Sequence, residues 1–229
     1  MLIHESLLTN PLYKKSESEN DGLALVGSTA LNIYSPGIST GGFTEIIMAL
    51  DNPQRKITAT TIDENGIQET EKLVKQYGVE SQVTLKLEDV SQKLPYEDAS
   101  FDFIYARLVL HYLPKAQLAA AMSELHRILK PDATFFVVVR SFDWESEVPE
   151  KTTDPETELT SYPEYDEAGH VIKTVQRNLQ TVESITRYLN QAGFKIENIK
   201  ELQETIYGGY LRVRPNKLPS NLIEVVARK

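Results

Sequence analysis

The chain has 229 residues, enough for one large domain with a buried core, and its 41% hydrophobic and 25% charged residues are ordinary for a globular protein. It contains no cysteine, which excludes disulfides, thiolate metal sites and cysteine nucleophiles, and we expect no metal. The net charge of −9 comes without a basic stripe, and no apolar run reaches the ~18 residues that span a bilayer, so we expect neither nucleic acid nor membrane as a partner.

The first two thirds of the chain alternate between strand-like and helix-like segments. Residues 1–22 are polar and irregular, and we interpret them as an N-terminal extension with a short helix; one domain over 23–229 follows. The run at 56–63 is rich in β-branched residues, and the run at 133–142 is almost continuously apolar, as in a strand covered on both faces. Strands are expected at 30–35, 56–63, 82–89, 100–110 and 133–142, and helices at 43–50, 65–78 and 115–130.

The last part of the chain departs from this alternation. A helix over 181–194 opens at Thr181 and ends at Gly193, and strands near 195–207 and 221–228 follow without a helix between them. The final strand is therefore expected to run antiparallel to its neighbours. The whole pattern predicts a doubly wound, Rossmann-like α/β fold, with a seven-stranded, mostly parallel sheet and a C-terminal antiparallel hairpin.

Three residues mark the carboxyl ends of the first three strands, where open α/β sheets bind their ligands. Gly37 follows the first strand, Asp63 ends the second and Asp89 ends the third. An acid after the second strand can accept hydrogen bonds from ribose hydroxyls, and an acid after the third can accept one from an exocyclic amino group such as that of adenine. The alternative is that both acids are helix N-caps.

Several segments together resemble the class I S-adenosylmethionine-dependent methyltransferases. "ATTIDENG" is similar to the family's second strand with its ribose-binding acid at Asp63. Residues 85–114, with Leu94-Pro95 and Phe101-Asp102, resemble the adenine-contact strand, the following loop and the fourth strand. The helix, Lys-Pro turn and fifth strand of the family are similar to "LHRILKPDATFFVV", and its last helix and hairpin to "TVESITRYLNQAGFKIENI" with "NLIEVVARK".

The resemblance implies that the protein binds S-adenosylmethionine, releases S-adenosylhomocysteine, and methylates a nitrogen or oxygen nucleophile of a small molecule. The cofactor-binding residues that it implies are Asn32, Gly37, Ser39, Gly41, Asp63, Glu64, Asp89, Val90 and Arg107. For Arg107 the alternative is an ion pair with an acidic residue.

The first loop departs from the family's pattern, which has an acid followed by glycines at alternate positions. In "ALNIYSPGISTGG", residues 30–42, Asn32 stands where the acid would be. Pro36-Gly37 can form a type II turn, and the amides of residues 39–42 can face the carboxylate of the cofactor at the start of the next helix. The alternative is a non-catalytic protein that binds S-adenosylmethionine or another metabolite, with a methyltransferase fold and a degenerate first loop.

The acceptor side is marked by residues after the fourth and fifth strands. His111 is the candidate general base, because the ordinary pKa of histidine is near neutrality; the alternative is a histidine packed at a strand end. Tyr112, Arg140 and Trp144 are candidate substrate residues. Residues 143–180 form an insertion that we expect to be a substrate lid; its acidic residues either attract a cationic acceptor or, as we favour, belong to a solvated loop.

We therefore expect a methyltransferase that acts on a small molecule as a monomer or homodimer. A cytoplasmic location is the default, because the N-terminus lacks the basic-then-apolar order of a signal peptide. A nicotinamide-dependent oxidoreductase shares the strand-turn-helix opening but is disfavoured, because the first turn lacks Gly-x-Gly-x-x-Gly and the chain ends in an antiparallel hairpin.

Overall fold

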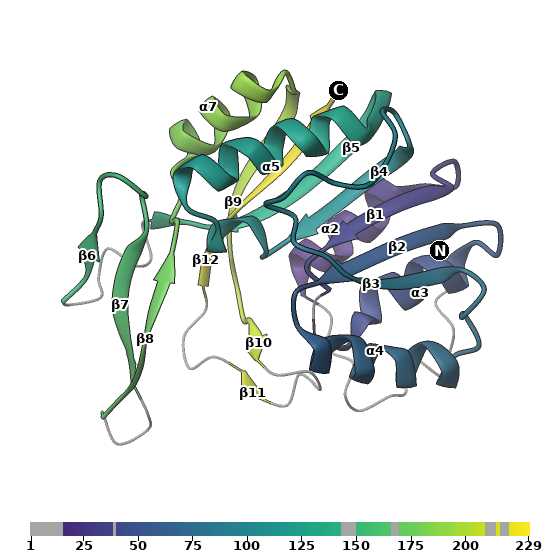
Figure 1. The fold of residues 1–229 in the computed structure, drawn as a ribbon, viewed down its shortest axis with the longest axis horizontal. Helices are drawn as coiled ribbons and strands as arrows, with labels where there is room; N and C mark the ends of the chain where they lie inside the picture. The colour runs from purple at the N-terminus through teal and green to yellow at the C-terminus, as the bar shows by residue number, and fades with distance from the viewer. Residues whose placement is uncertain (1–15, 39, 143–149, 166–169, 209–213, 216–219) are drawn as a thin grey trace.

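The structure is a computed structural model, and it describes residues 16–38, 40–142, 150–165, 170–208, 214–215 and 220–229. A seven-stranded sheet forms the centre of the molecule (Figure 1). Its strands are β1 (Asn32–Pro36), β2 (Lys56–Thr61), β3 (Val83–Leu87), β4 (Phe101–Arg107), β5 (Leu129–Arg140), β9 (Lys195–Glu204) and β12 (Ser220–Arg228).

The sheet has the order β3-β2-β1-β4-β5-β12-β9. The first five strands pair in parallel, whereas β12 runs antiparallel to both β5 and β9. The expected doubly wound sheet with an antiparallel C-terminal hairpin is thereby confirmed. The strand order reverses between β1 and β4, which is the point where such sheets bind ligands.

Helices cover both faces of this sheet (Figure 1). One face carries α2 (Glu17–Val26), α3 (Phe43–Asp51) and α4 (Glu64–Gln76), and the other carries α5 (Lys115–Ile128) and α7 (Val182–Ala192). Helix α7 begins and ends where its sequence predicts: the side chain of Thr181 caps the amide of Ser184, and Gly193 takes a left-handed φ of 96°. Among the described helices, none is both long and apolar enough to cross a membrane.

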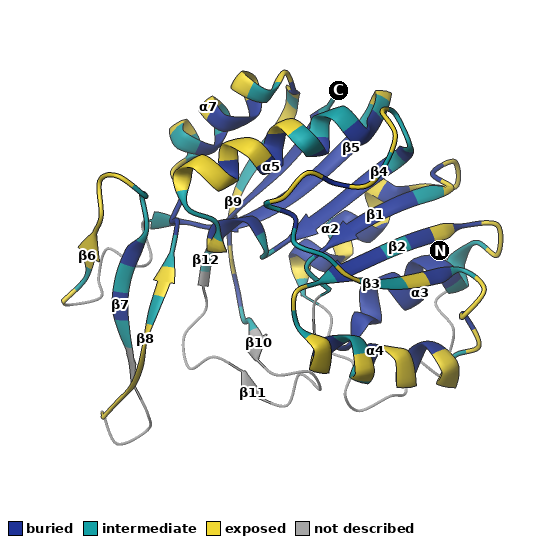
Figure 2. Cartoon of the chain, viewed as in Figure 1, coloured by how far each residue is buried: buried dark blue, intermediate teal, exposed yellow. Residues whose placement is uncertain are grey.

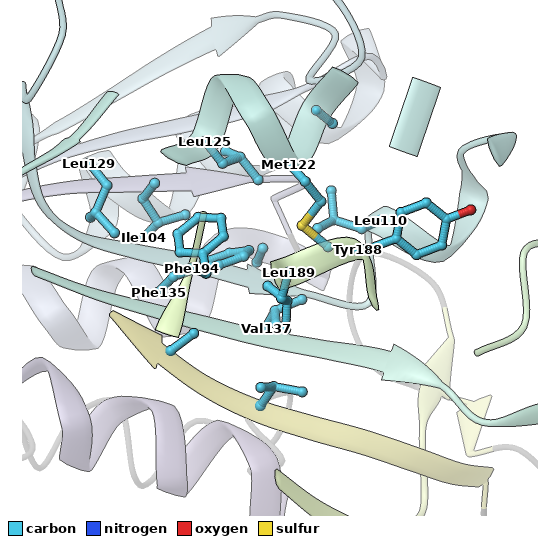
Figure 3. Packing of buried hydrophobic residues seen from close by; sticks show 14 of the residues in the cluster. Ile104, Leu110, Met122, Leu125, Leu129, Phe135, Val137, Tyr188, Leu189 and Phe194 are labelled. Atoms are coloured by element: carbon cyan, nitrogen blue, oxygen red, sulfur yellow. The ribbon is translucent and has the colours of Figure 1, made fainter. Parts of the chain in front are cut away.

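The two helical layers bury the central strands of the sheet, whereas the edge strands β3 and β9 are more exposed (Figure 2). Figure 3 shows the cluster beneath α5 and α7, in which Phe135 and Val137 of β5 pack against Met122, Leu189 and Phe194. These side chains are at most 3% exposed. Burial of this kind stabilises by about 25 cal/mol per Å² of apolar surface, so the sheet edge that carries the site rests on a rigid base.

Helix α2 lies against the sheet, and the expected boundary between residues 22 and 23 falls inside it. A Cβ atom on Gly22 would lie 2.5 Å from a ring carbon of Tyr105, so α2 approaches β4 as closely as only glycine allows. Leu23 and Val26 are buried in the same core. The helix therefore belongs to the packed domain from residue 17 onward.

The insertion after β5 folds as a small antiparallel sheet that projects from the body of the molecule (Figure 1). It consists of β6 (Thr152–Thr153), β7 (Thr160–Tyr165) and β8 (Val171–Arg177). A further short pair, β10 (Tyr207–Gly208) with β11 (Arg214–Pro215), lies between β9 and β12 in the chain.

Candidate functional site

The carboxyl ends of β1, β2 and β3 bring the three predicted marker residues to one edge of the sheet. Pro36 pairs with Thr60, and Thr61 pairs with Leu87. Gly37 therefore comes directly after the last paired residue of β1. Asp63 and Asp89 lie two positions beyond the last paired residues of β2 and β3. The described residues at this edge thus include Gly37, Asp63 and Asp89 side by side on neighbouring strands.

Gly37 is fitted closely to the segment that follows β4. Its φ is 70°, and a Cβ at this position would lie 2.4 Å from Cγ2 of Val109. The chain after β4 turns sharply at Leu108, a non-glycine residue with a φ of 58°. Left-handed non-glycine residues are strained and cluster at functional sites. The Ile38 amide donates to the carbonyl of Thr60 at 2.7 Å and so continues the pairing of β1 with β2 beyond Gly37.

The glycine pair of the first loop forms the 3₁₀ turn η1 (Thr40–Gly42) that leads into α3. Gly41 and Gly42 both have left-handed φ values, 79° and 65°. A Cβ on Gly42 would lie 2.4 Å from Cγ2 of Thr70, so η1 is packed against α4. Ser39, predicted to bind the cofactor, lies outside the described residues.

Asp63 is the N-cap of α4, as the structural alternative requires. Its Oδ1 accepts the amide of Asn65 at 2.9 Å. A carboxylate has about four lone-pair sites, so the cap leaves acceptor capacity for ribose hydroxyls. Glu64 is exposed at the first position of the helix, and Ile62 is 76% exposed just before the cap. The predictions did not include Ile62; a large apolar side chain facing water at this edge suits the flat face of a base.

Asp89 is bonded within its own turn. Its Oδ1 accepts the amide of Ser91 at 2.9 Å, and its Oδ2 accepts from Nε2 of Gln92 at 3.4 Å. Partial burial acts to raise the pKa of the carboxyl group, but these hydrogen bonds outweigh it and the pKa is lowered. Asp89 is therefore an ionised acceptor at neutral pH. Val90 is 6% exposed and packs in the core, so its side chain supports the turn from below.

The side chains of Tyr34 and Ser35 occupy the part of β1 where the family would carry glycines. Tyr34 is fully buried, and its hydroxyl donates to Oε1 of Glu88 at 2.8 Å. Tyr96 donates to the same carboxylate at 2.9 Å and packs edge-on against Tyr34. Ser35 donates to Oε1 of Glu45 at 2.6 Å. These contacts tie β1 to the end of β3 and to α3, and so fix the base of the first loop.

The prediction that Asn32 binds the cofactor is not supported by its position. Asn32 is the first residue of β1, so it lies at the opposite end of the strand from Gly37. Its amide nitrogen and its side chain both donate to Oδ2 of Asp102, at 2.8 and 3.2 Å. Asp102 also pairs with Lys130 at 2.6 Å. Asn32 thus fastens the start of β1 to the start of β4.

Arg107 takes part in a buried ion pair, which is the alternative given for it above. Its guanidinium bonds to Glu204 and donates to the hydroxyl of Ser18 at 2.7 Å and to that of Ser16 at 2.9 Å. Glu19 lies 3.9 Å from the same guanidinium. Burial acts to lower the pKa of Arg107, but the charges of Glu19 and Glu204 outweigh it and the pKa is raised. The side chain joins α2 and β9 to β4.

His111 lies in the 3₁₀ turn η2 (Leu110–Tyr112), directly after β4. The side chain is 1% exposed, and neither ring nitrogen has a hydrogen-bond partner among the described residues. Burial, followed by the charges of Arg140 and Arg177, holds the pKa well below its ordinary value. The imidazole is therefore neutral, with one N–H group and one lone pair for a ligand.

The other predicted acceptor residues gather around His111. Tyr112 is 55% exposed and its ring centre lies 4.4 Å from that of His111, while Arg140 is buried at the end of β5. Arg177, at the end of β8, was not predicted; its guanidinium lies 5.7 Å from the centre of the Tyr112 ring. Trp144 lies outside the described residues.

The edge thus has two halves with different chemistry. The half over β1, β2 and β3 offers glycine turns, two carboxylates and exposed apolar surface, which suits a nucleoside with a charged tail. The half over β4 and β5 offers a neutral imidazole, two arginines and an aromatic ring. The two halves meet where Gly37 touches Val109, so a group passed from one ligand to another has a short path.

Comparison with known proteins shows what the chain resembles. Residues 35–137 match the methyltransferase-domain family model. A sterol 4-C-methyltransferase of Caenorhabditis elegans is 31% identical over 94 residues, which are 40% of this chain and 27% of that protein. The chain therefore matches about a quarter of the length of this curated relative.

Solved structures agree over most of the chain. A S-adenosylmethionine-dependent methyltransferase from Methanosarcina mazei has a TM-score of 0.70 at 18% identity, covering 90% of this chain and 95% of that one. A 1,6-didemethyltoxoflavin N1-methyltransferase from Burkholderia thailandensis, solved with bound 1,6-didemethyltoxoflavin and S-adenosylhomocysteine, has a TM-score of 0.62 at 18% identity, covering 93% of this chain and 76% of that one. Residues 35–137 thus resemble a methyltransferase domain, and the chain has the fold of the class I S-adenosylmethionine-dependent methyltransferases.

Proposed function

We propose that the protein transfers a methyl group from S-adenosylmethionine to a nitrogen or oxygen atom of a small molecule. The observation that carries this proposal is the placement of Gly37, Asp63 and Asp89 at one edge, at the reversal of strand order. The methyltransferase match over residues 35–137 supports the same reaction. The methylated small molecule named for the Burkholderia relative supports a small acceptor.

The residues at this edge fit the cofactor. The close approach of Gly37 to Val109 leaves no room for a side chain and lets the backbone come near a ligand. Asp63 receives the ribose hydroxyls, Asp89 receives the amino group of adenine, and Ile62 covers one face of the base. The turn at Gly41 and Gly42 directs amides of the α3 start towards the methionine carboxylate, where the helix dipole favours an anion.

Bound there, the cofactor supplies an electrophilic methyl group on a sulfonium. The chain's own contribution is to align the acceptor with that methyl group and to keep water out. His111 acts as general base: its neutral ring takes the proton that an amine or hydroxyl loses as its lone pair forms the new bond. The insertion at 143–180 serves as the lid of the acceptor site, because the end of β8 reaches η2.

Calorimetric titration with S-adenosylhomocysteine and S-adenosylmethionine tests the proposal. We expect binding in the micromolar range, with roughly −8 kcal/mol of free energy. Absence of binding at millimolar ligand would overturn it. Binding without transfer of labelled methyl to any member of an acceptor panel would instead favour the non-catalytic alternative.

A further inference from the structure

The small sheet β6–β8, called the arm below, is joined to the body of the molecule by the residues that follow β8. These residues form backbone hydrogen bonds to the carboxyl ends of β4 and β5. The amide of Asn178 donates to the carbonyl of His111 at 2.7 Å, and the amide of Gln180 donates to the carbonyl of Arg140 at 3.0 Å. The carbonyl of Gln180 in turn accepts the amide of Phe142 at 2.8 Å. Segments far apart in the sequence thus bring His111, Arg140 and Arg177 to one place.

The side chain of Arg177 is held in position by two aromatic rings. Its guanidinium lies 5.7 Å from the ring centre of Tyr112 and 5.6 Å from that of Tyr162, and it also bonds to the hydroxyl of Tyr162. Cation–π contacts of this kind fix the position of a planar guanidinium. Arg140 is 6% exposed, so its charge is also carried in a largely dry environment.

A buried imidazole without hydrogen bonds is costly, at about 1–3 kcal/mol for each unmade bond. Both nitrogens of His111 are in this state among the described residues. Such a group in a native structure points to a ligand that completes it. The ligand has to suit two positive charges beside a neutral ring.

Two acidic residues of the arm, Glu158 and Asp154, are engaged in other contacts. Glu158 pairs with Lys115 at 2.7 Å and accepts the hydroxyl of Tyr188 at 2.6 Å. Asp154 accepts the amide of Glu156 and the hydroxyl of Thr157 within its own turn. These two carboxylates support the arm and its contact with α5 and α7, and neither gives the acceptor site a negative charge.

Resting on the proposed function, we propose that the methyl acceptor carries a carboxylate that Arg140 and Arg177 bind, so that its nucleophilic N–H or O–H group faces His111. The fork of a guanidinium matches the two oxygens of a carboxylate, and an incoming anion exchanges with whatever partners the arginines hold beforehand. The anion also offsets the positive field at His111 and so makes the imidazole more basic. The acceptor thereby activates its own base.

The transfer then balances in atoms and charge. The lone pair of the acceptor nitrogen or oxygen forms the bond to the methyl carbon, and the carbon–sulfur bond breaks with its electron pair remaining on sulfur. The proton of the acceptor passes to His111 and from there to water. The carboxylate is an anchor and stays unmodified.

Nuclear magnetic resonance of the imidazole tests the anion site without knowledge of the acceptor. The full chain is titrated with benzoate and, as a matched neutral probe, with benzamide, and the His111 signal is assigned with a H111Q variant. We expect benzoate to shift the signal saturably at millimolar concentration and to raise the pKa of His111, and benzamide to do neither. An equal response to both probes, or none to benzoate, overturns the proposal.

Two substitutions locate the effect. Arg177→Gln is expected to weaken benzoate binding at least tenfold, whereas Arg187→Gln, an exposed arginine beside Glu158, is the matched control and should bind benzoate like the wild type. Unchanged benzoate affinity in Arg177→Gln overturns the proposal. S-adenosylhomocysteine titration of the same samples reports on the fold and on the proposed function. If the protein binds benzoate but not S-adenosylhomocysteine, the anion site stands and the proposed methyltransferase function fails. If it binds S-adenosylhomocysteine but not benzoate, only the proposal of a carboxylate-bearing acceptor fails.

Discussion

Gly37 approaches Val109 so closely that a Cβ atom at residue 37 would lie 2.4 Å from Cγ2 of Val109. The first loop and the segment after β4 therefore lock together at the point where the cofactor half and the acceptor half of the edge meet. Gly37→Ala has to overcome both this clash and a left-handed φ. We expect it to lower the free energy of unfolding by about 3 kcal/mol and to weaken S-adenosylhomocysteine binding at least tenfold.

Gly78 offers the matched control for this substitution. Its φ is 68°, but no atom lies within 4 Å of an added Cβ. Gly78→Ala should therefore cost only the backbone strain, about 1 kcal/mol, and leave nucleoside binding unchanged. Urea unfolding and calorimetry measure both quantities; equal effects of the two substitutions would show that the contact with Val109 does not matter.

Asp63 allows the cap and the ribose contact to be separated. Asparagine caps helices as well as aspartate, so Asp63→Asn should keep the free energy of unfolding within about 0.5 kcal/mol of the wild type. The loss of the carboxylate should nevertheless weaken S-adenosylhomocysteine binding about tenfold. Asp63→Ala removes the cap as well and should cost about 1 kcal/mol of stability. Wild-type affinity in Asp63→Asn would leave the cap as the residue's only role.

Arg107 is predicted to support the fold and not to bind the cofactor. Arg107→Met leaves Glu204 and Glu19 buried without their cation, and such losses cost about 3–5 kcal/mol. Lys200→Met is the control: Lys200 is partly exposed and pairs with Glu17 and Asp21 on the same helix, so about 0–1 kcal/mol is expected. The folded fraction of Arg107→Met should bind S-adenosylhomocysteine normally. If a fully folded sample of Arg107→Met bound S-adenosylhomocysteine more weakly, Arg107 would have a role in binding the cofactor.

Glu224 makes stability depend on pH. Burial, together with the charge of Asp21, raises the pKa of this carboxyl group to about 7 from an ordinary value of 4.5, although Lys200 opposes the shift. The folded chain therefore binds the proton more tightly than the unfolded chain, and the stabilisation is complete below pH 4.5 and lost as the pH rises through 7. The Oε2 atom has no hydrogen-bond partner among the described residues, so Glu224→Gln keeps the shape without the charge.

Urea unfolding of Glu224→Gln at pH 4.5 and pH 8 checks this linkage. The variant should match the wild type at the lower pH and exceed it at the higher pH, by up to about 3 kcal/mol. Glu201→Gln, at an exposed position on β9, should follow the wild type at both values. A constant difference between Glu224→Gln and the wild type would exclude titration of Glu224 as the cause.

The sequence predicts this fold well because strand and helix ends carry local markers. Thr181, Gly193 and the β-branched run before Asp63 each identify an element end without reference to the rest of the chain. The start of the domain has no such marker. Helix α2 crosses the expected boundary because Gly22 lets it settle against Tyr105, and nothing near Gly22 in the sequence reveals that contact.

The site divides in the same way. The ends of the strands in the sequence predict the positions of Gly37, Asp63 and Asp89 at the edge of the sheet. The assignment of Asn32 depended instead on where β1 begins. A shift of a few residues along a strand moves a side chain to the other end of the sheet. Arg107 bonds to Glu204, 97 residues further along the chain, so the ion pair is visible only in three dimensions. Arg177 reaches η2 through a hairpin whose path the sequence does not specify.

The joint between the arm and the sheet has an evolutionary consequence. The bonds from Asn178 to His111 and from Gln180 to Arg140 join main chain to main chain, so they do not depend on which side chains the arm carries. Most of the hairpin is thus free to mutate, shorten or be exchanged while its attachment survives. A scaffold built in this way can acquire a new acceptor by replacing this one hairpin, with the nucleoside half of the edge left untouched.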